Sequence, residues 1–145
     1  MATRSVIAKL DENGIKAVYC HNDGYLEHNG TILDSYYQDE SKVDELLSHG
    51  DISSLGNNIG EKINWDDVEL QHKNQQCMFY NRDRGEKRKP AAILEDDIAL
   101  IEFADEDCDA QFIYMYAFGA WYVYAIGKDH QFKELDDILS KVYKD

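Results

Sequence analysis

The apolar positions at the start of the chain predict a β-hairpin. Residues 3–10 read "TRSVIAKL" and residues 15–20 read "IKAVYC", two short runs of β-prone and apolar side chains. Between them lies "DENG", whose Asn13-Gly14 pair is favoured in two-residue hairpin turns because both positions need a positive φ. We therefore predict two antiparallel strands within residues 3–20.

From residue 31 onward the apolar positions repeat at helical spacing. They predict one helix capped by Thr31 and a second that Ser41 caps and that stops at Gly50. The inward positions of these two helices are Ile32, Leu33, Tyr36, Tyr37, Val43, Leu46 and Leu47. "HQFKELDDILSKVYKD" near the C-terminus predicts a further helix, with an inward face made of Phe132, Leu135, Ile138, Leu139 and Val142.

The strongest β pattern lies between residues 111 and 127. "QFIYMYAF" and "WYVYAIG" flank Gly119-Ala120, a turn with glycine first, as type II′ requires. Both faces of this hairpin are apolar or aromatic, which predicts a central place in the sheet. "QCMFYNRDR" predicts another strand, centred on residues 78–80, and residues 81–90 a loop. "GDISSLGNNIGEKI" reads as a loop anchored by Ile52, Leu55 and Ile59, whereas "IALIEF" fits either a strand or a short helix.

With 145 residues, 43% of them apolar, the chain can fill one hydrophobic core. It has no internal repeat and no linker. We expect a single α+β domain over residues 1–145, an antiparallel sheet with helices packed on it.

The net charge says more about the partners of this chain than its composition does. The formal net charge is −14, from 29 acidic and 15 basic residues. Such a field repels phosphates and membrane surfaces and attracts basic protein surfaces, so we expect no direct nucleic-acid binding and no membrane association. Residues 91–109, the acid block, contain no Lys or Arg. Its acids are Glu95, Asp96, Asp97, Glu102, Asp105, Glu106, Asp107 and Asp109, and all of them except Glu102 are our partner-binding candidates.

Three cysteines, Cys20, Cys77 and Cys108, form no CxxC motif and are too widely spaced for a zinc site. We expect buried free thiols in a reducing compartment and no metal. The N-terminus lacks the apolar region of a signal peptide, and no run reaches the roughly 20 apolar residues that span a bilayer. The expected location is the cytoplasm.

The segment "YCHNDGY" at residues 19–25 gathers a thiol, an imidazole, a carboxylate and two phenols. Neighbouring strand residues point to opposite faces, which rules against a direct Cys20–His21 dyad. We expect Tyr19 and His21 on one face, Cys20 buried on the other, and a turn at Asp23-Gly24. For His21 and Tyr25, scaffold and pocket wall remain equally open interpretations.

The segment "FYNRDRGEKRKP" places five cations within residues 82–89. Arg82 and Arg84 can grip a phosphate or carboxylate while Tyr80 or Tyr25 stacks on a base. A second interpretation is that these cations neutralise the acid block. A third is that the run from Arg82 to Glu86 ties the loop to the sheet by buried ion pairs.

Taken in order, "TRSVIA", "YCHNDGY", "GDISSLG" and "FYNRDRGE" resemble the successive motifs of a family of small proteins encoded by bacteriophages, prophages and some bacteria. The family carries no catalytic assignment, and it often has Trp where this chain has Asn22. The resemblance implies a set of candidate residues, which are Arg4, His21, Asp23, Tyr25, Asp51, Arg82, Asp83, Arg84 and Glu86.

Two functions fit these observations. The leading hypothesis is a non-enzymatic, acidic, phage-type accessory protein without a cofactor that acts in the host cytoplasm. It would bind and inhibit a basic host protein, namely a nucleic-acid-handling or anti-phage defence enzyme, by nucleic-acid mimicry. It could also form a homo-oligomer. The alternative is a nucleotide- or signalling-metabolite-binding protein or enzyme, with a pocket of His21, Tyr25, Tyr80, Arg82 and Arg84.

Overall fold

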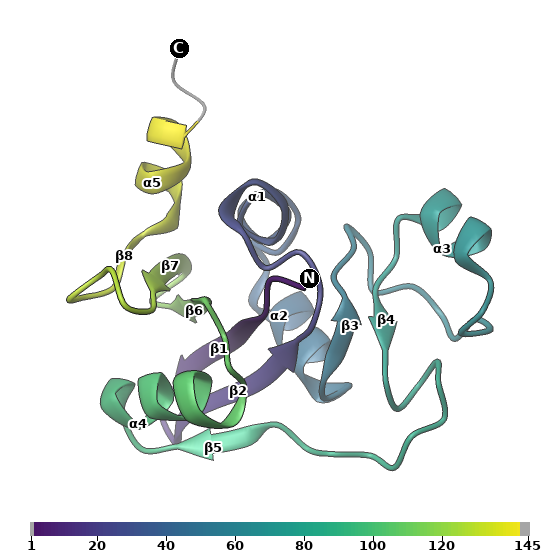
Figure 1. The fold of residues 1–145 in the computed structure, drawn as a ribbon, viewed down its shortest axis with the longest axis horizontal. Helices are drawn as coiled ribbons and strands as arrows, with labels where there is room; N and C mark the ends of the chain where they lie inside the picture. Colours follow the sequence, from purple (N-terminus) through teal and green to yellow (C-terminus); the bar gives the residue numbers. More distant parts are fainter. Residues whose placement is uncertain (1, 143–145) are drawn as a thin grey trace.

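The computed structural model describes residues 2–142 and confirms the α+β class (Figure 1). In chain order its elements are β1 Ser5–Asp11, β2 Gly14–Cys20, the π-helix η1 Leu26–Gly30, α1 Thr31–Tyr36, α2 Glu40–Ser48, β3 Ile52–Ser54, α3 Val68–Asn74, β4 Met78–Phe79, β5 Ala92–Leu94, α4 Asp97–Glu102, the π-helix η2 Phe103–Asp107, β6 Phe112–Ala117, β7 Ala120–Ala125, β8 Lys133–Glu134 and α5 Leu135–Val142.

The strands form an eight-stranded sheet in the order β4-β3-β2-β1-β6-β7-β8, with β5 paired to β2 beside this path. Most pairings are antiparallel, as predicted, but β1–β6 and β2–β3 are parallel. The predicted hairpin at residues 3–20 is β1–β2, joined in seven residue pairs from Ser5↔Cys20 to Asp11↔Gly14. Its two turn residues are therefore Glu12 and Asn13, and the predicted Asn13-Gly14 turn was wrong by one residue, with only Gly14 at positive φ. β1 therefore lies in the middle of the sheet, between β2 and β6.

Helices cover both faces of this sheet. Figure 1 shows α1, α2 and α5 on one side and α4 on the other. Side chains of β1 alternate between the two layers: Ile7 joins the cluster under α1, α2 and α5, whereas Val6 and Ala8 join the cluster under α4 and η2. This arrangement explains why both faces of the β6–β7 hairpin are apolar.

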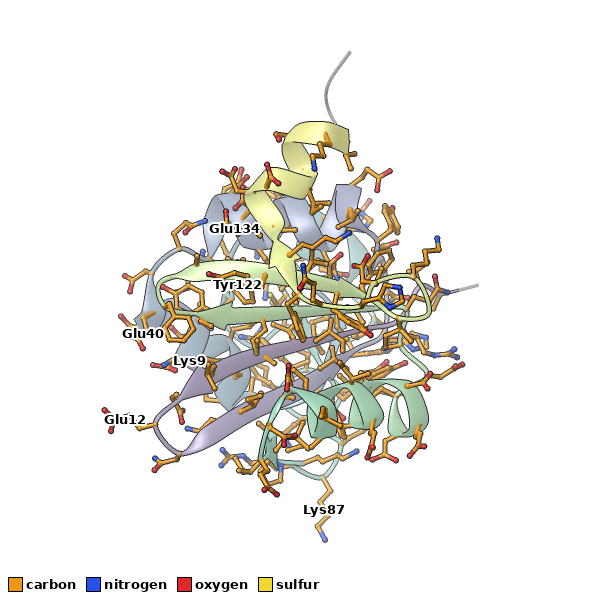
Figure 2. All side chains as sticks on the ribbon, turned by 90° about the vertical axis from the view of Figure 1, so that its left-hand side faces the viewer. Lys9, Glu12, Glu40, Lys87, Tyr122 and Glu134 are labelled. Atoms are coloured by element: carbon orange, nitrogen blue, oxygen red, sulfur yellow. The ribbon has the colours of Figure 1, made fainter. Side chains whose placement is uncertain are left out.

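One charged side chain lies inside this packing. Lys9 of β1 is almost fully buried, and its ammonium contacts Asp44 at 2.7 Å and Glu40 at 2.9 Å on α2 (Figure 2). Burial works against the charged form, but the hydrogen bonds to the two carboxylates outweigh it and raise the pKa of Lys9. The ion pairs thus fix the start of α2 against the central strand.

Several predicted boundaries were wrong by a few residues. The cap of α2 is Asp39, whose carboxylate accepts from the Ser41 N–H at 2.9 Å, so Ser41 is not the cap. Thr31 does not cap α1, because η1 runs directly into that helix through Gly30. Part of the predicted 50–63 loop is β3, and the polar stretch after it contains α3, which has no buried residue.

The C-terminal helix is shorter than predicted. It begins at Leu135, after the short strand β8, and only Leu135 and Leu139 of its expected inward positions are buried. Phe132 precedes the helix and packs on Tyr124 in the cluster under α4, with ring centroids 5.2 Å apart. Val142 is exposed.

The turn of the second hairpin differs from the prediction by one residue. Ala117 pairs with Ala120, so the turn residues are Phe118 and Gly119 rather than Gly119 and Ala120. Their φ values are 54° and 78°, which makes this a type I′ turn with glycine second, not a type II′ turn. A phenylalanine at positive φ is uncommon and strained, because its Cβ crowds the backbone there.

We predict that Phe118→Asn stabilises the protein. Asparagine tolerates positive φ, and the exposed ring loses little packing, so the free energy of unfolding should rise by about 1 kcal/mol. Urea unfolding followed by circular dichroism measures it. Phe118→Ala also removes the ring but lacks the asparagine amide, whose local hydrogen bonds favour positive φ, so it serves as the control and should change stability less. A clear loss of stability in Phe118→Asn would contradict this account of the turn.

Candidate functional site

The end of β2 separates the side chains of "YCHNDGY" as its strand geometry requires. The Tyr19 hydroxyl lies 2.6 Å from His21 Nδ1 on the α4 side, and Cys20 is fully buried on the opposite side. Arg4 donates from Nε to the Tyr19 oxygen at 3.1 Å and pairs with Asp109 at 3.1 Å. His21 is thus the end of a polar chain that runs from Asp109 through Arg4 and Tyr19.

The rest of the segment is built as scaffold. Asn29, fully buried, donates to Cys20 Sγ at 3.4 Å and to the Asn22 carbonyl at 3.4 Å. Gly24 lies so close to β1 that a Cβ there would come within 2.8 Å of the Thr3 oxygen, and its own carbonyl accepts from the Tyr114 hydroxyl at 2.6 Å. Glycine is therefore required at this turn.

Tyr25 is half exposed, and its nearest aromatic neighbour is His28, with ring centroids 6.1 Å apart. It does not meet His21, which contacts Tyr19 instead. The two residues that the sequence left open between scaffold and pocket wall therefore do not share a cavity.

Arg82 and Asp83 form a structural clamp. The buried Asp83 carboxylate accepts from Arg82 Nε at 3.0 Å, from the Phe79 N–H at 2.8 Å and from the Ile63 N–H at 3.1 Å. Arg82 also donates to the Gly60 carbonyl at 2.7 Å and to the Cys77 carbonyl at 3.2 Å. The pair ties the 60–63 segment to β4. It is the one buried ion pair of the third interpretation, since the Arg84–Glu86 pair is exposed.

Two of the remaining cations form ion pairs with acids outside the acid block. Arg84 pairs with Glu86 at 3.2 Å and lies over the Trp65 ring at 5.1 Å, and Lys89 pairs with Asp51 at 3.7 Å. Among the described residues, no cation of residues 82–89 pairs with the acid block. The interpretation that this island neutralises the acid block is therefore wrong.

A cavity of about 230 Å³ lies where the edge of β2 passes from β5 to β3. We call this place the fork. Asp51 holds it, because its carboxylate accepts from the Tyr19 N–H at 3.1 Å. Burial raises the pKa of Tyr80 and of Tyr19 here, so both phenols stay protonated at neutral pH. The cavity is lined by Tyr19, His49, Asp51, Tyr80, Asn81, Glu86, Lys87 and Lys89.

The predicted ligand set is therefore not brought together. Tyr80 lines the fork cavity, but His21, Tyr25, Arg82 and Arg84 do not. The motifs do meet there, through Tyr19, Asp51 and Glu86. Sequence reasoning missed Tyr19 as a cavity residue, although the alternation of β2 puts it on the same face as His21.

The acid block forms α4 and η2, and each of its eight acids is exposed. Asp96 caps α4 by accepting from the Ala99 N–H at 2.9 Å. Asp109 pairs with Arg4, and this is the one ion pair of the acid block within the part of the chain that the structure describes. Two apolar side chains beside these acids, Ile93 and Ile98, are also exposed.

The three cysteines are free and buried. Residues 2–142 contain no group of three or more His, Cys, Asp or Glu placed to hold a metal ion. Over the same range, no helix has the length and apolar character needed to cross a membrane. Comparison of the chain with protein-family models, curated proteins and solved structures finds no match.

Arg82→Ala tests the clamp. It leaves the Asp83 carboxylate buried without its guanidinium partner, so the free energy of unfolding should fall by about 3–5 kcal/mol. Arg84→Ala removes an exposed ion pair and a contact with the Trp65 ring, and should cost about 1 kcal/mol. Urea unfolding of both variants measures the contrast. Equal, small losses would show that the clamp is not structural.

Thiol chemistry gives a second test of this region. Burial raises the pKa of Cys20 and of Cys108 to about 12, and burial also raises the pKa of Cys77. At pH 8 a thiol with such a pKa holds only about one part in ten thousand as the reactive thiolate. Iodoacetamide should therefore label the native protein very slowly and the urea-unfolded protein completely, as measured by mass spectrometry. Rapid labelling of any cysteine in the native protein would refute the prediction that the buried thiols are unreactive.

Proposed function

We propose that the protein is a non-enzymatic binding protein that uses the acid block to occupy a basic surface of a partner protein. The observation that carries this proposal is that all eight acids of the acid block are exposed and that, among the described residues, only Asp109 of them is paired with a cation. Carboxylates left without counter-charges on one face attract a basic partner and speed its approach.

The cations of the chain support the proposal by their positions. Lys9, Arg82 and Lys89 pair with acids away from α4 and η2, and thereby leave the acid block negative. The competing small-molecule function depended on His21, Tyr25, Arg82 and Arg84 lining one pocket, and none of the four lines the fork cavity. The fork cavity alone, whose Asp51 and Glu86 already pair with Lys89 and Arg84, offers an anionic ligand little.

The resemblance to phage and prophage proteins suggests what the partner is. A protein made in an infected bacterial cytoplasm meets basic nucleic-acid-handling and defence enzymes of the host. Carboxylates presented to such an enzyme compete with the phosphates that its basic cleft binds. We infer that the protein inhibits an enzyme of this class by covering that cleft.

The decisive experiment captures a bacterial protein on the immobilised chain, purifies that protein and titrates it. The test variant neutralises the partner-binding candidates of the acid block that neither cap a helix nor form an ion pair: Glu95→Gln, Asp97→Asn, Asp105→Asn, Glu106→Gln and Asp107→Asn. The control variant removes as many exposed charges elsewhere: Glu45→Gln, Glu61→Gln, Asp66→Asn, Glu69→Gln and Asp136→Asn.

We expect the test variant to bind at least about tenfold more weakly than the control variant, since each exposed charge pair contributes about 0.2–1 kcal/mol. Wild-type affinity should fall as salt rises, and the captured enzyme should lose nucleic-acid binding in the presence of the chain. Equal binding by the two variants, or affinity that ignores salt, would rule out the acid block as the binding face.

A further inference from the structure

Phe118, at the tip of the β6–β7 hairpin, is 90% exposed, more than any other large apolar side chain in the described part of the chain. The other aromatic residues of this hairpin are placed differently: Tyr114, Tyr116 and Trp121 are buried, and Phe112, Tyr122 and Tyr124 are partly buried. Phe118 is the one aromatic ring of the hairpin that contributes nothing to the core, so its presence needs an explanation outside folding.

The backbone strengthens this point. Phe118 has φ 54° and is the first residue of a type I′ turn, a position that Asn or Gly fills with less strain. Nothing lies within 4 Å of the place where a Cβ on Gly119 would be, so the turn projects into open space. Folding would be served better by another residue here, and the ring is not packed against a neighbouring element.

Carboxylates surround the end of the sheet from which Phe118 projects. The parallel pairing of Lys9 with Tyr116 places the β1–β2 turn, with Asp11 and Glu12, beside the β6–β7 turn. The Tyr116 hydroxyl donates to the Gln38 carbonyl at 2.9 Å, which brings the acidic start of α2 to the same end. Figure 2 shows Glu12 and Glu40 on the same side of the molecule, with Lys9 between them.

The start of the acid block reaches this end as well. Leu94 of β5 pairs with Ile15, directly after the β1–β2 turn, so Glu95 and Asp96 follow at that turn. Of the nearby cations, Lys9 is buried and held by Glu40 and Asp44. The exposed ones are Lys16 of β2 and Arg88, which line a cavity together with Asp11, and the acids of this end outnumber them. The hairpin end thus presents an apolar ring within a rim of negative charge; its acids are Asp11, Glu12, Asp39, Glu40, Glu95 and Asp96.

An aromatic anchor within a charged or polar rim is the arrangement that protein–protein interfaces use for their binding energy. The negative charge of the rim indicates which kind of molecule can bind at the hairpin end. Like-charge repulsion disfavours a second copy of this chain at −14, and the same field repels nucleic acid. A protein whose basic surface contains an apolar socket fits both the ring and its rim.

We propose that Phe118 is the anchor through which this protein docks into an apolar socket on its basic partner. This inference rests on the proposed function and adds to it. Carboxylates alone would suffice for imitation of a nucleic acid, whereas an aromatic anchor commits the protein to a partner with a specific socket. Such binding has a component that salt does not weaken.

The test uses the purified partner from the capture experiment as the probe, with Phe118→Asn as the variant. Tyr25→Asn is the matched control, because Tyr25 is also an exposed aromatic residue and the Gly24–Thr3 hydrogen bond places it at the opposite end of β1. We expect Phe118→Asn to bind at least tenfold more weakly, while Tyr25→Asn stays within about twofold of wild type. Because Phe118→Asn is expected to fold more stably, misfolding cannot mimic the loss.

Photo-crosslinking identifies what covers the ring. With p-benzoylphenylalanine in place of Phe118, irradiation of the full chain with the purified partner should give one adduct, and the same group in place of Tyr25 should give none. Three outcomes would each refute the proposal that Phe118 is the anchor. They are binding of Phe118→Asn with wild-type affinity, an adduct between two copies of this chain, and an adduct from position 25 alone.

The outcomes separate this inference from the proposed function. If neutralising the acid block abolishes binding but Phe118→Asn binds normally, the proposed function stands and the anchor is wrong. If Phe118→Asn loses binding while neutralising the acid block does not, the hairpin end is the interface and the acid block is not. If the chain captures no basic protein, both proposals fail.

Discussion

The fold depends on the burial of β1 between two layers of helices. β1 pairs with β2 in seven residue pairs on one side and with β6 in five on the other, and its side chains feed both hydrophobic clusters. A strand buried on both faces has no room for unpaired charge, which is why Lys9 carries two carboxylates with it. The second hairpin, the fork, α2 and α4 are placed by contacts with this strand or its immediate partners.

The charge of the molecule is arranged around the same constraint. Three cations each form an ion pair with a carboxylate of the fold. Lys9 pairs with Asp44 of α2, and Arg82 pairs with Asp83 next to β4. Arg4 pairs with Asp109, which follows η2. Since bases are outnumbered by acids, the acids that serve no structural purpose stay exposed. The negative surface is therefore what remains after the structural ion pairs are satisfied, and it concentrates on α4, η2 and the hairpin end.

Local signals predicted much of this fold. Asn13-Gly14 located the first hairpin, and strand alternation placed Tyr19 and His21 together with Cys20 opposite. What failed depended on contacts distant in the chain. The parallel β1–β6 pairing joins segments separated by most of the sequence, and α3 buries no side chain, so no apolar period reveals it. The hydrogen bonds from Arg82 to two loop carbonyls leave no sequence pattern at all, which made that arginine look like a ligand.

The fork gives the protein a divided edge. One half of β2 is bordered by β5 and the other by β3, and these neighbours do not pair with each other. Each flank can consequently lengthen, shorten or loosen without shifting the register of the opposite flank, because that register is set on the far side of β2. Variation among related sequences would be accommodated in the excursions after β3 and before β5, and the middle of the sheet would stay constant.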